Sequence, residues 1–260
     1  MQRRILDIHL HLNKKMASSA KEAARLLHED LVAHNIEKAL ILHLNFQGWS
    51  AEEFSEALTP YKKRMAGLIN IHPFEKDARA QLKRGIDKLG FIGLKLHPRL
   101  ENYSLDAPET QALVRCAGEL NVPTLIDAFP DGTWLMNGYD TLSFGKLALA
   151  CPQSRIIVAH MGGHRVLDML MLVKRIKNLY FDFSYSLLYF QKSSVLNDIL
   201  FAMRSLKCER LFYGSDYPDR SIADTIKQSL EILEGAGFTD AELDRLLFKN
   251  AKEFFNWNDI

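Results

Sequence analysis

The chain has 260 residues, and 47% of them are hydrophobic, which is enough for one large core or two small ones. Lysine and arginine total 33 against 32 aspartates and glutamates, so the formal net charge is +1, and no basic stripe indicates a nucleic-acid or membrane partner. The three cysteines lack metal-type spacing, which predicts reduced thiols, and the apolar run near the N-terminus is too short for a signal peptide or membrane span. We therefore expect a soluble, cytoplasmic protein.

Eight short apolar runs, rich in residues that favour strands, recur along the chain at intervals of 24 to 33 residues. They begin near Ile5, Lys38, Met65, Phe91, Val122, Arg155, Leu179 and Arg210. Helical patterns lie between them: Ser19 with Glu22 is typical of a helix start, and Gly90 and Asn121 are typical of helix ends. Eight strand–helix units predict an α/β fold, a (β/α)8 TIM barrel formed by residues 1–260 as a single domain. A doubly wound open sheet shares the local pattern and is the alternative.

Polar side chains finish most of these runs, at the strand ends where a barrel carries its chemistry. They are His9, His11, His43, Asn45, Asn70, His72, Lys95, His97, Asp127, His160, Asp182, Ser184 and Asp216. Residues i and i+2 of a strand share a face, so His9 and His11 can hold one divalent ion, although two hydrogen-bonded core histidines would give the same pattern. Strands one and eight are neighbours in a closed barrel, so Asp216 can complete a His-His-Asp site.

Six motifs occur in the order typical of one enzyme family. "DIHLHL", "GLKLHPRL", "VPTLIDA", "VAHMGG", "FYGSDYP" and "LLFKNAKEFF" span Asp7 to Phe255 and resemble the amidohydrolase superfamily, specifically the amidohydrolase 2 branch of metal-dependent hydrolases and decarboxylases. The resemblance implies one divalent metal, usually zinc, held by His9, His11 and Asp216 at the strand carboxyl ends. It also implies that His160 lies beside the metal and polarises the substrate or assists the attacking water.

The chain departs from this family pattern at the end of the fifth strand, where Asp127 replaces a metal-binding histidine. Asp127 is a candidate metal ligand, since a carboxylate binds zinc or manganese. The shorter side chain could also move the metal or bind it through water. Loss of tight metal binding is the third interpretation, and catalysis without a metal is then left open.

Two residues of the fourth strand are candidates for substrate binding, Lys95 and His97. Other branches of the superfamily carbamylate a lysine at this strand to bridge two metals, but no second ligand set is present here, so we expect one metal and an unmodified Lys95. A cationic Lys95 could bind a substrate carboxylate. Arg99 is interpreted as a solvated charge on the rim, and the stretch "AFPDGTWLMNGYDTLS" as a long loop that could cover the site.

The predicted reaction is hydrolysis of a small carbonyl substrate, a lactone, amide or ester, by metal-activated water. Asp216 would take the proton of that water and return it to the leaving group, while His160 would stabilise the oxyanion. Decarboxylation by the same set of residues is the alternative reaction. Two further alternatives are a catalytically inactive barrel that binds a ligand, and a phosphoesterase or nuclease. Assembly as a homo-oligomer is left open.

Overall fold

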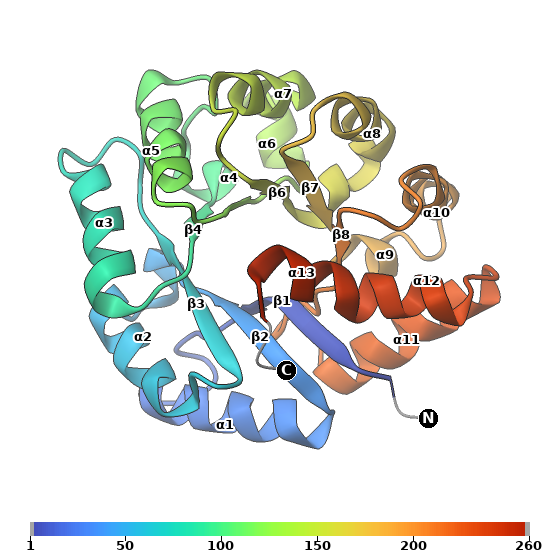
Figure 1. Ribbon diagram of the computed structural model, residues 1–260, viewed down its shortest axis with the longest axis horizontal. Coiled ribbons are helices and arrows are strands. Elements are labelled where there is room, and N and C mark those ends of the chain that lie inside the picture. Colours follow the sequence, from blue (N-terminus) through green and yellow to red (C-terminus); the bar gives the residue numbers. More distant parts are fainter. Residues whose placement is uncertain (1–2, 258–260) are drawn as a thin grey trace.

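Eight parallel strands form one sheet in the order β1 to β8 in the computed structural model, which describes residues 3–257. The strands are β1 Ile5–His11, β2 Ile36–Leu42, β3 Met65–Asn70, β4 Leu94–Leu96, β5 Thr124–Ile126, β6 Ile156–Val158, β7 Leu179–Asp182 and β8 Leu211–Phe212. They occur in sequence order and are surrounded by helices (Figure 1). This arrangement confirms the TIM barrel and excludes the doubly wound sheet, whose strand order reverses at a switch point.

The barrel closes where the β8 segment meets β1. The Ile8 N–H donates to the Tyr213 carbonyl at 3.0 Å, and the Asp216 N–H donates to the His9 carbonyl at 2.8 Å. These bonds continue beyond the two residues of β8 that pair regularly with β7. The loop that carries Asp216 is therefore fixed directly against the strand that carries His9.

The helices follow the strands and lie around the outside of the barrel, except for α13, which crosses one end of it (Figure 1). They are α1 Ala20–Ala33, α2 Ala51–Leu58, α3 Ala78–Leu89, α4 Pro98–Glu101, α5 Pro108–Glu119, α6 Gly132–Met136, α7 Thr141–Ala150, α8 Val166–Arg175, α9 Ser186–Tyr189, α10 Val195–Ser205, α11 Ile222–Gly235, α12 Asp240–Asp244 and α13 Asn250–Phe255, with short 3-10 segments η1 Asn45–Gln47, η2 Thr59–Tyr61 and η3 Ala159–Arg165 and a π-helical segment η4 Arg245–Lys249. The predicted helix signals are confirmed at two places, because the Ser19 side chain caps α1 and Gly90 ends α3 in the left-handed conformation. The stretch after β5 is more ordered than the predicted loop, since it forms α6 and the start of α7.

A β-bulge in β1 decides which of its side chains enter the barrel. The register against β2 shifts between Asp7 and Leu10. Leu6 and Ile8 belong to the apolar cluster inside the barrel, and His9, the next residue, also faces inward. A strand without a bulge would alternate strictly and could not place Ile8 and His9 on one side.

The last segment of the chain closes the bottom of the barrel. The η4 segment and α13 pack against β1 and β8. Apolar side chains from this segment join those that point inward from six strands, forming one buried cluster of Leu6, Ile8, Leu40, Leu42, Leu68, Leu125, Ile157, Ala159, Phe212, Phe248, Ala251, Phe254 and Trp257. Because this apolar cluster fills the bottom of the barrel, the polar residues lie at the opposite end, where the strands have their carboxyl ends.

Two further expectations from composition can be compared with the structure. Cys116, Cys151 and Cys208 are buried free thiols, as predicted. Within residues 3–257, none of the helices combines the length and apolar character needed to cross a bilayer.

Candidate active site

The side chains of His9, His11 and Asp216 converge at the carboxyl ends of the strands, where β1 meets the loop after β8. The Nε2 atoms of His9 and His11 lie 3.5 and 3.6 Å from the same oxygen, Oδ1 of Asp216. The ligand atoms of this group all lie within 4.8 Å of one another. The strand adjacency used in the sequence argument therefore brings these residues together, across more than 200 positions of sequence.

Hydrogen bonds place a proton on Nδ1 of both imidazoles. His9 Nδ1 lies 3.0 Å from Asp182 Oδ2, and His11 Nδ1 lies 3.1 Å from the Leu42 carbonyl. A carboxylate and a carbonyl oxygen only accept hydrogen bonds, so each Nδ1 carries a proton and each Nε2 is the atom that can bind a metal. Two imidazole nitrogens beside one carboxylate oxygen form a donor set that fits a divalent ion such as zinc or manganese.

The charges of the cluster agree with this pattern. Burial lowers the pKa of His9 to about 4, although the Asp182 charge opposes the shift, so His9 is neutral near pH 7. Burial alone would raise the pKa of Asp216, but its contacts with the neighbouring histidines, including the charge of His160, lower it below its ordinary value. Neutral imidazole and ionised carboxylate are the forms that bind a metal.

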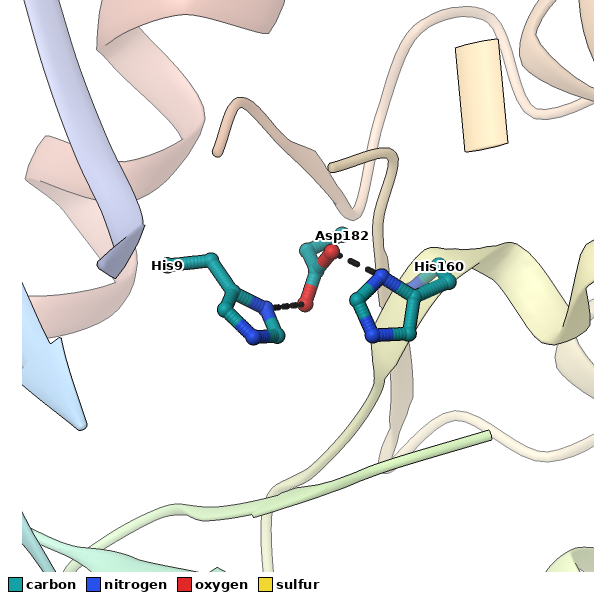
Figure 2. A group of neighbouring side chains, drawn as sticks. All are labelled: His9, His160 and Asp182. Carbon is teal, nitrogen blue, oxygen red and sulfur yellow. Dashed lines mark hydrogen bonds and ion pairs between the residues drawn. The ribbon is translucent and has the colours of Figure 1, made fainter. Parts of the chain in front are cut away.

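Asp182, at the end of β7, is a hydrogen-bonding centre behind these ligands (Figure 2). Its Oδ1 accepts from the backbone N–H groups of His160 and Ser184, both at 3.1 Å, and from the Ser184 hydroxyl. Its Oδ2 faces His9. The ligand atoms of His9, His160 and Asp182 also lie within 4.8 Å of one another. However, Asp182 is fully buried and both of its oxygens already accept hydrogen bonds. We therefore interpret these three residues as a hydrogen-bonded network and not as a second metal site.

From the sequence, Asp182 is predicted only as one of the polar residues at the strand ends, without a role of its own. Its position at the end of an apolar strand was the available signal. Nothing in the local pattern could identify His9, 173 residues away, as its partner.

His160 lies next to this cluster at the end of β6. Its ring centroid is 4.9 Å from that of His9. Nδ1 lies 3.1 Å from the Ser184 carbonyl, and Nε2 lies 3.3 Å from Asp127 Oδ1. Burial alone would lower the pKa of His160, but contact with Asp127 and other nearby carboxylates raises it to about 8. With acceptors at both nitrogens, the imidazolium is the form that satisfies both contacts.

Asp127 is surrounded by positive charge and lies outside the group that converges on Asp216. Its Oδ2 accepts from Arg99 Nε at 3.0 Å, and its Oδ1 faces His160. Among residues 3–257, Asp127 is not in either group of side chains whose ligand atoms converge closely enough for a metal. Burial would raise the pKa of Asp127, but the adjacent cations hold it well below its ordinary value. Its assignment as a metal ligand remains a prediction, and these contacts support another role, which is proposed below.

Arg99 differs from its interpretation as a solvated rim charge. Its side chain is only 19% exposed and forms ion pairs with Asp127 and, through Nη1 at 2.7 Å, with Asp131. Asp131 in turn caps α6 by accepting from the Trp134 N–H. The prediction was wrong because a carboxylate from the next strand, which the local sequence does not reveal, draws the guanidinium inward.

Lys95 and His97 are both buried at the end of β4. Burial lowers the pKa of Lys95, while the charges of Asp127, Asp182 and Asp216 act in the opposite direction. Burial also lowers the pKa of His97 to about 3, and its Nδ1 lies 3.8 Å from Asp127 Oδ2 without a hydrogen-bond partner among residues 3–257. Their contact with substrate remains a prediction.

A glycine permits the close approach of the β8 loop to β1. A Cβ added at Gly214 would lie 2.6 Å from His9 Cβ and 2.9 Å from Ser184 Cβ, too close for any side chain. Two residues later, Asp216 has a φ of 59°, a left-handed conformation that is unfavourable for most residues other than glycine. The "YGSDYP" motif therefore serves to position the carboxylate.

Comparison with known proteins agrees with this geometry. The family model described as amidohydrolase matches residues 45–257, so the chain belongs to the amidohydrolase family, in the amidohydrolase 2 branch, and is an amidohydrolase-like enzyme. The match begins after His9 and His11, whose place in the site therefore rests on the structure. A search of curated proteins finds no match.

Solved structures with the same barrel include proteins with different reactions. A probable 2-pyrone-4,6-dicarboxylic acid hydrolase from Acinetobacter baumannii, with citric acid bound, is 18% identical, with a TM-score of 0.73 over 98% of this chain and 100% of that one. An uncharacterised TIM-barrel protein from Bordetella bronchiseptica is 17% identical, with a TM-score of 0.79 over 97% and 98%. A 5-carboxyvanillate decarboxylase from Novosphingobium aromaticivorans, with bound manganese, is 14% identical, with a TM-score of 0.67 over 98% and 97%. At these identities the likeness shows the fold.

Proposed function

We propose that the chain is a metal-dependent hydrolase of a small carbonyl compound, with one barrel domain carrying the whole site. The observation that carries the proposal is the convergence of two imidazole nitrogens, Nε2 of His9 and Nε2 of His11, at one oxygen of Asp216. These residues would hold one divalent ion, which we expect to be zinc, with manganese as the alternative. When bound, the ion would supply Lewis acidity that lowers the pKa of water from about 15.7 toward about 7 and polarises a carbonyl.

The protein's own residues divide the proton transfers between them. The Asp216 side chain is 18% exposed, whereas that of His9 is 2% exposed, so within this pair the carboxylate is the group that meets incoming water. Asp216 takes a proton as the water attacks and returns it to the leaving group. His160, kept positive by Asp127, directs its charge at the oxygen that becomes negative.

Asp127 supports the reaction through its neighbours in this proposal. Its contacts with His160 and Arg99 keep the imidazolium charged and hold the guanidinium beside the site. Asp127→Ala should leave zinc affinity close to that of wild type and lower turnover by about 10²-fold. A large loss of zinc affinity in Asp127→Ala, with a gain in Asp127→His, would instead establish Asp127 as a ligand.

The decisive experiment is elemental analysis of protein purified without chelator, followed by turnover assays with lactone, ester and amide panels. We expect about one equivalent of divalent ion, lost in His11→Ala and retained in the matched control His28→Ala, whose ring stacks on Tyr61 away from the cluster. Absence of metal from the wild type, or hydrolysis that persists after complete metal removal, would contradict the proposal.

Decarboxylation of an aromatic carboxylic acid is the second candidate. It is favoured by the buried Lys95 near the carboxylates of the site, which in its protonated form could bind a substrate carboxylate, and by the manganese-containing decarboxylase of the same fold. Release of CO₂ from a panel of hydroxybenzoic acids, in the absence of lactone or ester hydrolysis, would establish this reaction in place of hydrolysis.

A further inference from the structure

The one carboxylate of β1, Asp7, is fully buried close to the proposed metal ligands and has no role in the reaction described above. Its Oδ1 accepts two backbone hydrogen bonds, from the His9 N–H at 3.1 Å and from the Ser215 N–H at 3.0 Å. Its Oδ2 has no hydrogen-bond partner among residues 3–257. All of its described hydrogen bonding is therefore directed at two peptide groups.

One of these peptide groups belongs to a proposed metal ligand, and the other lies next to one. The first is the N–H of His9, and the second is the N–H of Ser215, the residue before Asp216. The β1 bulge displaces His9 from the regular ladder, and Asp216 has a left-handed backbone. Buried N–H groups need an acceptor, and Asp7 Oδ1 is the acceptor for both of these groups.

We propose that Asp7 is a positioning residue that clamps the β1 bulge to the β8 loop and thereby sets the spacing between His9 and Asp216. The Asp216 N–H also donates directly to the His9 carbonyl, between the same two segments. A shift of the backbone at Asp7 would therefore move both proposed ligands. This inference rests on the proposed function, because the spacing matters through the metal that these residues would hold.

The test uses two near-isosteric substitutions that separate the clamp from the fold. Asp7→Leu keeps a branched side chain with the same number of heavy atoms but removes the acceptor, whereas Asp7→Asn keeps an oxygen for both N–H groups. The matched control is Asn250→Leu. Asn250 is a buried clamp near the other end of β8, where its Nδ2 donates to the Cys208 and Leu211 carbonyls, both at 2.7 Å.

The first measurement is zinc and manganese affinity of the metal-free protein, by competition with a chelator. We expect Asp7→Leu to weaken binding by about 10–100-fold, as removal of a hydrogen bond that orients a ligand typically does. We expect Asp7→Asn to remain within about threefold of wild type, since a neutral oxygen still accepts both bonds. The proposal is overturned if Asn250→Leu weakens binding as much as Asp7→Leu, or if Asp7→Asn fails to rescue it.

The second measurement is amide hydrogen exchange of the metal-free protein over residues 5–12 and 211–217. Asp7→Leu should speed exchange in both segments and leave β5 and β6 unchanged, and Asp7→Asn should restore protection. Unchanged exchange in Asp7→Leu would overturn the clamp. If wild type binds no metal but the exchange result holds, the proposed function fails while the clamp between β1 and the β8 loop stands.

Discussion

Replacing Asp182 by asparagine tests whether the tautomer of His9 is what makes the cluster a metal site. The two oxygens of Asp182 accept hydrogen bonds from different donors. Oδ2 accepts from His9 Nδ1, and Oδ1 accepts from the backbone N–H groups of His160 and Ser184. An asparagine has one acceptor and one donor end. If its oxygen faces the two N–H groups, its NH₂ faces His9 and forces the proton onto Nε2, the atom needed for the metal. If it is flipped, the NH₂ opposes two N–H donors.

The size of the effect follows from this conflict. Binding a metal in Asp182→Asn requires His9 Nδ1 to keep its proton against another donor, so the hydrogen bond to a charged group, worth about 1.5–3 kcal/mol, is lost in the bound state. Each 1.4 kcal/mol corresponds to about a tenfold change in affinity. We therefore expect zinc and manganese to bind about 10–100-fold more weakly, in agreement with the usual cost of losing a partner behind a metal-bound histidine.

The assay is a chelator-competition titration of the metal-free proteins, with circular dichroism to verify the fold. Asp219→Asn is the matched control, because it makes the same chemical change at an exposed aspartate three residues after Asp216. Wild-type affinity in Asp182→Asn would refute the tautomer argument. An equal loss in Asp219→Asn would show that general charge, instead of a specific hydrogen bond, controls binding.

Three further predictions concern turnover, acid stability and packing. Asp216→Asn should lower turnover of a verified substrate by about 10²–10⁴-fold with little change in thermal unfolding, because the amide cannot carry the proton; retained activity would remove Asp216 from its role. Burial lowers the pKa of His97 from 6.5 to about 3, so the unfolded chain binds a proton there before the folded chain does, and stability should fall as pH drops from 6.5 toward 3. His97→Leu should flatten this fall in melting temperature measured from pH 7 to pH 4, and an identical slope would contradict the reasoning. Gly214→Ala places a methyl group within 2.6 Å of His9 Cβ, and should lower the free energy of unfolding by about 1–3 kcal/mol. In calorimetry each kcal/mol should lower the melting temperature by roughly 2–4 °C. Gly235→Ala, whose added Cβ meets nothing within 4 Å, is the control and should not lower the melting temperature.

The sequence alone indicated the barrel and the ends of its strands. Short apolar runs and helical patterns are local signals, because they depend on residues a few positions apart. The order of the runs then makes the first and last strands neighbours in a closed barrel, so the sequence predicts that His9, His11 and Asp216 lie together. The same local signals predicted the Ser19 cap and the Gly90 helix end, both confirmed.

Tertiary structure alone decided how the site residues are paired. The bulge in β1 turns His9 inward and lets Asp7 accept a hydrogen bond from the His9 N–H. This bulge depends on the register between two strands, which cannot be deduced from the periodicity of one strand. Arg99 leaves the rim because Asp127, on the next strand, offers a buried charge. Asp182 orients His9 from 173 residues away. Such pairings depend on hydrogen-bond geometry and burial between distant segments, and those exist only once the chain has closed into a barrel.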